Sequence, residues 1–180
     1  MKMSFNPIVF ASNLARAYEI ARCGGHSIQV VLGENQDEQS LTKRDLEYIL
    51  EYFNLQQTGD ADMFVELTKP DARSILLSLS ASSRHETIAD INQRIDAFLL
   101  QGEGEPFSNV LSKNCQQLME TAITRLDFDL SDTEKALHVA QTIARMSGAS
   151  ALAAEHVAEA IQYRSLPVDQ RRIFLQTTQL

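Results

Sequence analysis

Residues 125–166, RLDFDLSDTEKALHVAQTIARMSGASALAAEHVAEAIQYRSL, decide the fold of this chain, because they have the pattern of two amphipathic helices joined by a corner. Ser131 and Glu134 have capping-box spacing, which predicts a helix start at Ser131. Apolar residues then recur at three- and four-residue spacing, and Gly148 stands where a helix can end in a left-handed conformation. A second helix with a matching apolar stripe is predicted from near Ala153. The two stripes can bury each other.

This segment resembles a known helical domain. Residues 125–166 are similar, without a gap, to the C-terminal helical lid of magnesium-chelatase subunit I and of the competence-type chelatase-like AAA+ ATPases, and EHVAEAIQYRSL from Glu155 is nearly verbatim. The resemblance implies that residues 108–180 form an AAA+ lid. In AAA+ rings the lid packs on the neighbouring subunit, so the resemblance also implies a protein partner, either an AAA+ ATPase or a second copy of this chain.

The size and charge of the chain limit its functions. Its 180 residues, 44% hydrophobic and 22% charged, suffice for one compact domain or two small ones. The formal net charge of −8 makes nucleic acid an unlikely partner, since phosphate backbones need clustered Lys and Arg. No stretch has the length of a membrane span, and Met1 to Ala11 lack the pattern of a signal peptide. We therefore expect a cytoplasmic protein without a membrane partner.

The cysteines and histidines do not predict a metal site. Cys23 and Cys115 lie far apart among apolar residues, so we expect two reduced core thiols. No HxxxH or CxxC spacing connects the histidines, which are His26, His85, His138 and His156. We expect His26 and His156 to be structural.

The first part of the chain predicts a helix followed by a strand. Pro7 is tolerated at a first helical position, an apolar face follows, and Gly24-Gly25 ends the helix. Residues 28–32, IQVVL, are short and β-branched, which predicts a buried strand. Residues 13–33 resemble the opening of the same ATPase family, where this helix and strand lead into the phosphate-binding loop.

The loop after this strand has lost the residues that bind phosphate. A working P-loop has the pattern GxxxxGK[ST]. Here only Gly33 and the hydroxyl of Ser40 remain, because Glu38 takes the place of the second glycine and Gln39 that of the lysine. Carboxylates so close to a triphosphate would repel it by several kcal/mol. We interpret residues 34–38 as a solvated acidic loop before a helix, in preference to a weak Mg²⁺ or Ca²⁺ site.

The middle of the chain lacks the remaining catalytic segments. A helix is predicted over residues 41–53 and a strand over residues 63–67, which resembles a strand near the end of the ATPase core. Between them the family places Walker B and sensor 1, and neither is present. A short helix is predicted over residues 71–79, and a capping box at Ser83–Glu86 predicts another helix.

Glycines and a proline predict a linker over residues 102–107. The predicted domains are therefore a remnant of the AAA+ α/β core at residues 1–101, the linker, and the lid at residues 108–180. The fold class is mainly α with a short two-strand, parallel β element.

The lid departs from the family at a nucleotide contact, and a basic cluster lies near its end. The family's sensor 2 arginine aligns with Ser131, and the next two arginines with Lys135 and Gln141. The basic cluster near the end consists of Arg164, Arg171 and Arg172. We interpret it as a solvated helix end, with a docking surface as the alternative.

Two functions follow from these observations. The first is a non-catalytic AAA+ remnant that works as a protein-interaction or regulatory module and needs no cofactor. The alternative is a nucleotide-binding ATPase subunit of a chelatase-like complex, which would use ATP or ADP with Mg²⁺. A chain that folds but has no function is a third reading. The absent Walker A lysine, Walker B and sensor 2 arginine favour the non-enzymatic reading.

Overall fold

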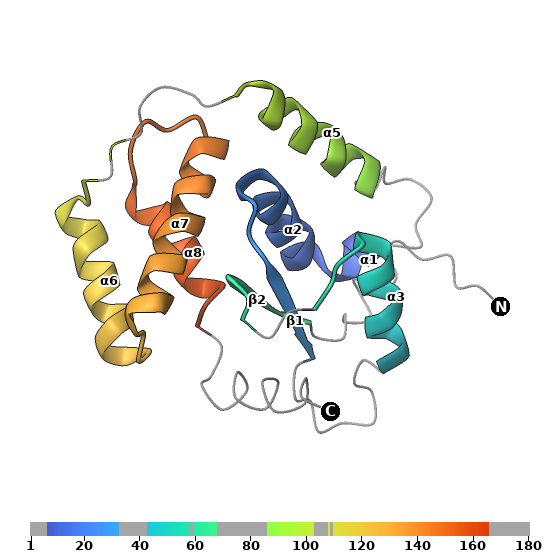
Figure 1. Ribbon diagram of the computed structural model, residues 1–180, viewed down its shortest axis with the longest axis horizontal. Coiled ribbons are helices and arrows are strands. Elements are labelled where there is room, and N and C mark those ends of the chain that lie inside the picture. Colours follow the sequence, from blue (N-terminus) through green and yellow to red (C-terminus); the bar gives the residue numbers. More distant parts are fainter. Residues whose placement is uncertain are drawn as a thin grey trace.

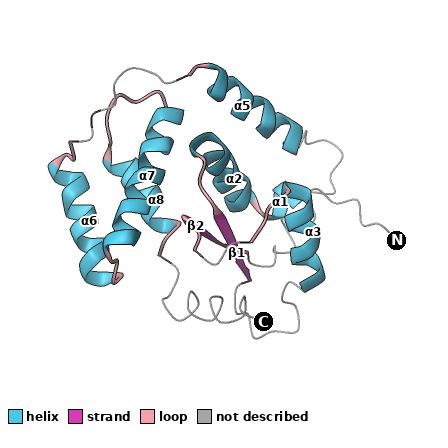
Figure 2. Cartoon of the chain, in the orientation of Figure 1, coloured by secondary structure: helices cyan, strands magenta, loops and turns pink. Residues whose placement is uncertain are grey.

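The computed structural model describes residues 7–32, 43–57, 60–67, 86–102, 108 and 110–165. It is mainly helical with a small parallel sheet, as the sequence predicts (Figures 1 and 2). The elements are α1 (Pro7–Phe10), α2 (Ser12–Gly24), β1 (Ile28–Leu32), α3 (Lys43–Phe53), β2 (Met63–Leu67), α5 (Ile88–Leu100), α6 (Lys113–Arg125), α7 (Leu130–Met146) and α8 (Ala154–Gln162). None of these helices is both long and apolar enough to cross a membrane.

The strands have the predicted positions. β1 and β2 pair in parallel, with Ile28 opposite Met63 and Leu32 opposite Leu67. Both strands are buried along most of their length, which fits their continuous apolar sequence. α2 ends as predicted, because Gly25 takes a left-handed conformation with φ of 70° that allows the chain to turn back into β1.

Helix α7 begins before the predicted cap. Its N-cap is Asp129, whose side chain accepts the Asp132 N–H at 2.8 Å, while the Asp132 carboxylate accepts the Asp129 N–H. The prediction that Ser131 caps this helix is therefore wrong. Both Asp129 with Asp132 and Ser131 with Glu134 have capping-box spacing. Burial of Phe128 and Asp132 favours the earlier pair. At the other end, Gly148 has φ of 74°, which confirms the predicted corner.

Helix α5 also has a different cap from the predicted one. Thr87 caps it and Asp90 completes the box, whereas Ser83 lies outside the described residues. The degenerate loop at residues 33–40, the helix predicted over residues 71–79, residues 103–107 of the linker, and both Arg171 and Arg172 likewise lie outside them.

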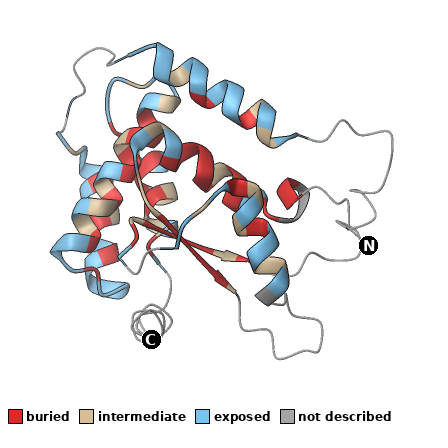
Figure 3. Ribbon diagram, turned by 45° about the vertical axis from the view of Figure 1, so that its right-hand side comes forward, coloured by how far each residue is buried: buried red, intermediate tan, exposed pale blue. Residues whose placement is uncertain are grey.

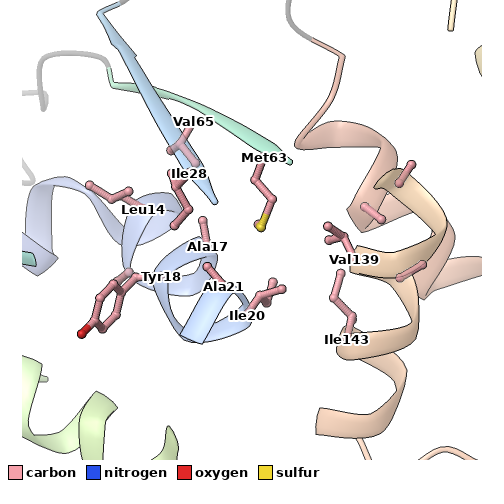
Figure 4. Close-up of a cluster of buried hydrophobic side chains, with 14 of the residues drawn as sticks. Leu14, Ala17, Tyr18, Ile20, Ala21, Ile28, Met63, Val65, Val139 and Ile143 are labelled. Carbon is pink, nitrogen blue, oxygen red and sulfur yellow. The ribbon is translucent and has the colours of Figure 1, made fainter. Parts of the chain in front are cut away.

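A single hydrophobic cluster joins the two predicted halves. Figure 1 shows α6, α7 and α8 together on one side of α2 and the strands, with α1 and α3 on the other. Ile20 of α2 and Val139 of α7 are both fully buried and belong to this cluster, which Figure 4 shows. The buried residues concentrate in α2, the strands and the inner faces of α7 and α8 (Figure 3). The described parts of the two halves therefore pack together.

Candidate functional site at the junction of the strands and the C-terminal helices

Arg164, just after α8, connects three segments of the fold. Its Nε donates to Asp132 Oδ1 at 3.0 Å, and its Nη1 donates to the carbonyl oxygens of Ala61 and Asp62 at 2.6 and 3.0 Å. Nη2 forms an ion pair with the same oxygen, Asp132 Oδ1. The guanidinium also lies over the ring of Phe64, 5.1 Å from its centroid. The side chain thus joins α8 to α7 and to the start of β2.

These contacts correct the interpretation of Arg164 as part of a solvated basic surface. The residue is only 4% exposed, so a partner cannot reach its charge. The physical reason lies in the backbone: the Phe64 N–H donates to the Tyr163 carbonyl at 2.6 Å, which holds the end of α8 against β2. An arginine at the next position must enter the interior, and it is tolerated there because a carboxylate and two carbonyls satisfy it. Nothing in the sequence spacing marks Asp132 as its partner.

Ser131, which we align with a sensor 2 arginine, lies at the start of α7. Ser131 is exposed in the first turn of α7, next to the buried Asp132. Lys135, one turn later, pairs with Asp60 in the segment before β2. Gln141 lies further along the helix and is half-buried. The assignment of Gly33, Glu38, Gln39 and Ser40 as a degenerate P-loop stays a prediction.

Further polar contacts cross between the halves. Arg16 of α2 donates to Glu159 of α8 at 3.0 Å. His26, after α2, lies 2.8 Å from the Thr142 hydroxyl of α7, measured from Nε2 to Oγ1. Gly24 is required beside this pair, because a Cβ there would overlap both the His26 ring and the Thr142 hydroxyl. His26 therefore has the structural role that we expected.

His156 stabilises the corner between α7 and α8. Its Nδ1 accepts the Ala153 N–H at 3.1 Å, and its Nε2 lies 3.2 Å from the Ser147 hydroxyl. The imidazole therefore joins the start of α8 to the end of α7. This contact agrees with the expected structural role and uses both ring nitrogens, which leaves neither one available for chemistry.

The pKa values of His26 and of the neighbouring Asp62 are both lowered in the fold, for different reasons. Burial lowers the pKa of His26, although the charge of Asp62 opposes this shift. Burial would raise the pKa of Asp62, but hydrogen bonds from the Ser27 N–H and hydroxyl, both 2.8 Å long, lower it overall. Near neutral pH the site therefore holds a neutral imidazole beside a carboxylate.

A cavity of about 910 Å³ opens beside these residues. The end of α2, the end of α5, one face of α7 and residues 148–150 line it. It lies at the Ile28 end of β1, whereas the predicted P-loop segment follows Leu32 in the sequence, at the other end of the strand. Sequence reasoning missed it, since its walls come from segments far apart in the chain.

The cysteines are not reactive groups of this site. Both are free, as predicted, and Cys115 is buried. Cys23 lines the cavity, but burial raises the pKa of its thiol to about 11, so it stays protonated at neutral pH and is a poor nucleophile. Among the described residues, no group of three His, Cys, Asp or Glu side chains is placed to hold a metal ion. The junction thus holds α2, α7, α8 and β2 together.

The C-terminal helices are similar to a known protein family. The model of the family "Magnesium chelatase, subunit ChlI C-terminal" matches residues 100–164. This range covers α6, α7 and α8 and less than half of the chain, so the similarity is established for that domain. No curated protein and no solved structure matches the chain.

Proposed function

We propose that this protein is a non-catalytic, chelatase-like AAA+ module that works by binding protein. Its partner is a full-length ATPase with the same type of lid or a second copy of the chain. The observation that carries the proposal is the contrast between an ordered, family-like lid and a loop in which Glu38 and Gln39 replace the phosphate-binding glycine and lysine.

The charges of the replaced residues support the loss of nucleotide binding. Lysine in a P-loop neutralises phosphate oxygens, while Gln39 carries no charge and Glu38 adds a negative one. At the lid, Ser131 stands where an arginine would contact the γ-phosphate. Both positions have an uncharged residue in place of a positively charged one that would contact ATP. This shared change favours a function without ATP.

The internal packing of the lid supports a function that depends on a fixed binding surface. Buried contacts hold α7 and α8 against each other and against β2, through the Val139 and Val157 side chains and the ion pair of Arg164. A lid held this rigidly presents a fixed surface to a partner, which lowers the entropic cost of association.

Association with an ATPase tests the proposal directly. The chain would be mixed with a full-length magnesium-chelatase-type ATPase and analysed by size-exclusion chromatography with light scattering, alone and in the mixture. We expect a complex with the ATPase or a self-associated species. An AAA+ ATPase without a chelatase-type lid is the control. A monomer that co-elutes with neither would count against the proposal.

A thermal melt separates this proposal from the ATPase alternative. A ligand that binds only the folded state at 100 times its Kd stabilises it by about 2.7 kcal/mol, which raises the melting temperature of a domain of this size by several degrees. We expect no shift with millimolar ATP or ADP and Mg²⁺. A saturable rise would favour the nucleotide-binding subunit instead.

A further inference from the structure

The cavity at the ends of α2, α5 and α7 has an unusual electrostatic construction. All three helices meet it with their carboxyl-terminal ends, through Gly24, Gln101 and the segment after Met146. Each helix carboxyl terminus carries about half a negative charge, because its last carbonyls lack intrahelical donors. Three such ends contribute roughly 1.5 negative charges to one cavity.

Asp62 adds a full negative charge to the lining. Among the described residues of the lining it is the only carboxylate, and its folded environment keeps it ionised at neutral pH. Both hydrogen bonds from Ser27 go to Oδ2, and no hydrogen bond from the described residues reaches Oδ1. An ionised carboxylate oxygen can accept a charge-assisted hydrogen bond from a cation, which is stronger than one between neutral groups.

The basic side chains in the lining do not reverse this sign. Arg145 is the only permanent cation in the described part of the lining. It lies in the last turn of α7, where its positive charge offsets the negative end of that helix dipole. His26 is held neutral by burial at ordinary pH. His138 lies one turn before Thr142 on the same face of α7. The remaining balance is negative, in a chain whose net charge is already −8.

We propose that this cavity binds a small organic cation, an alkyl diamine or similar amine, with one ammonium group at Asp62 and the methylene chain against Phe98 and Leu99. The volume, about 910 Å³, lies within the range of small-molecule sites. The Phe98 ring lines the cavity and can attract an ammonium group, and Leu99 is half-exposed. Backbone carbonyls at the three helix ends can accept the remaining ammonium protons.

The proposal predicts the sign of the pH dependence. His26 has Asp62 on one side, His138, Thr142 and Arg145 of α7 on another, and Cys23 and Gln101 around the same cavity. Protonation of His26 adds a positive charge beside the ligand. Binding of a cation should therefore weaken as the pH falls from 8 to 5.5, whereas binding of an anion would strengthen.

Titration of the full chain with 1,4-diaminobutane at constant ionic strength, followed by ¹H–¹⁵N NMR, tests the site. We expect saturable shifts centred on the amides of Gly25, Gly102 and Gly148, at least fivefold weaker binding at pH 5.5 than at pH 8, and no shifts with uncharged 1,4-butanediol. Asp62→Asn should weaken binding at least fivefold. Asp96→Asn, the same change of charge on the exposed face of α5, should leave it unchanged.

His138→Lys is a second variant, useful if Asp62→Asn disturbs the contact with Ser27. It places a permanent cation at the exposed edge of the cavity and should abolish binding without removing a buried group. Three results would each overturn the proposal: shifts that spread over the acidic surface without saturation, equal weakening by Asp96→Asn, or tighter binding at low pH. None of these depends on whether the chain docks on an ATPase.

Discussion

At the scale of single residues, the buried Arg164 shows how the fold uses a charge. Its guanidinium is satisfied by Asp132 and by two carbonyl oxygens, and the site is almost closed to water. Such a pair adds little stability compared with an apolar pair of the same shape, but its disruption leaves an uncompensated buried charge. The arginine therefore fixes the position of α8 relative to β2 and α7.

Arg164→Met is expected to destabilise the protein by about 3–5 kcal/mol, because Asp132 and the Ala61 carbonyl lose their donors in the interior. Urea denaturation followed by circular dichroism measures the change. Arg125→Met, at the exposed end of α6, is the matched control and should stay within about 0.5 kcal/mol. A similar small effect for Arg164→Met would contradict the buried network.

The pH dependence of stability should show the contribution of His26. Because burial lowers its pKa in the folded state below the ordinary 6.5, the unfolded chain binds a proton more readily. The stability is fully present above pH 6.5 and decreases as the pH falls toward the folded pKa. The lowered pKa of Asp62 acts at lower pH, since its stabilisation is lost only below about pH 4.

His26→Gln should remove this slope while keeping a polar group near Thr142. Free energies of unfolding at pH 8, 7, 6 and 5.5 would be compared for both proteins. We expect the wild type to lose more stability than the variant over this range. Identical slopes would show that His26 does not titrate differently in the two states.

At the scale of elements, the start of α7 shows where sequence patterns become ambiguous. Ser131 with Glu134 and Asp129 with Asp132 both have capping spacing, two residues apart. The choice of Asp129 depends on the burial of Phe128 just before it and on the use of Asp132 by Arg164. Both contacts are tertiary, so the local pattern could not decide between the two caps.

The two caps can be distinguished by alanine substitution. Asp129→Ala should cost about 1 kcal/mol, since the Asp132 N–H loses its acceptor and the first turn loses a negative charge. Ser131→Ala should change the free energy of unfolding by less than about 0.5 kcal/mol, because its side chain is exposed within the first turn. Chemical denaturation of both variants measures the difference. A larger loss of stability for Ser131→Ala than for Asp129→Ala would show that Ser131, as predicted from the sequence, caps the helix.

At the scale of the whole molecule, the core joins segments that the sequence divides. The predicted linker at residues 102–107 suggests two domains, and this division itself stays a prediction. However, α2 packs on α7, and ion pairs Arg16–Glu159 and Lys135–Asp60 cross between the halves. Because one hydrophobic cluster contains residues of both, the described parts should unfold as a unit.

Val139→Ala tests this cooperativity. The lost methyl groups and the cavity they leave should cost about 2 kcal/mol. Native-state hydrogen exchange would follow amides of α2 and α8, and Gln117→Ala on the exposed face of α6 is the control. We expect the slowest amides of α2 and α8 to accelerate by the same factor. Acceleration confined to α6, α7 and α8 would show two independent units.

The sequence by itself determined the elements whose causes are local. Apolar periodicity and β-branching placed both strands and the C-terminal helices, and Gly25 and Gly148 marked helix ends because few other residues accept a left-handed backbone. The sequence similarity of residues 125–166 to the family's C-terminal helices identified the lid-like module. These features depend on neighbours within a few positions, which a single sequence displays.

Only the tertiary structure decided the environment of each charge. Arg164 is in a basic cluster in the sequence and in a buried ion pair in the fold, because its partners are 32 and about 100 residues away. The cavity likewise exists only where α2, α5 and α7 end at one place. Solvation and long-range pairing determine what a charged side chain does, and neither is visible before the chain folds.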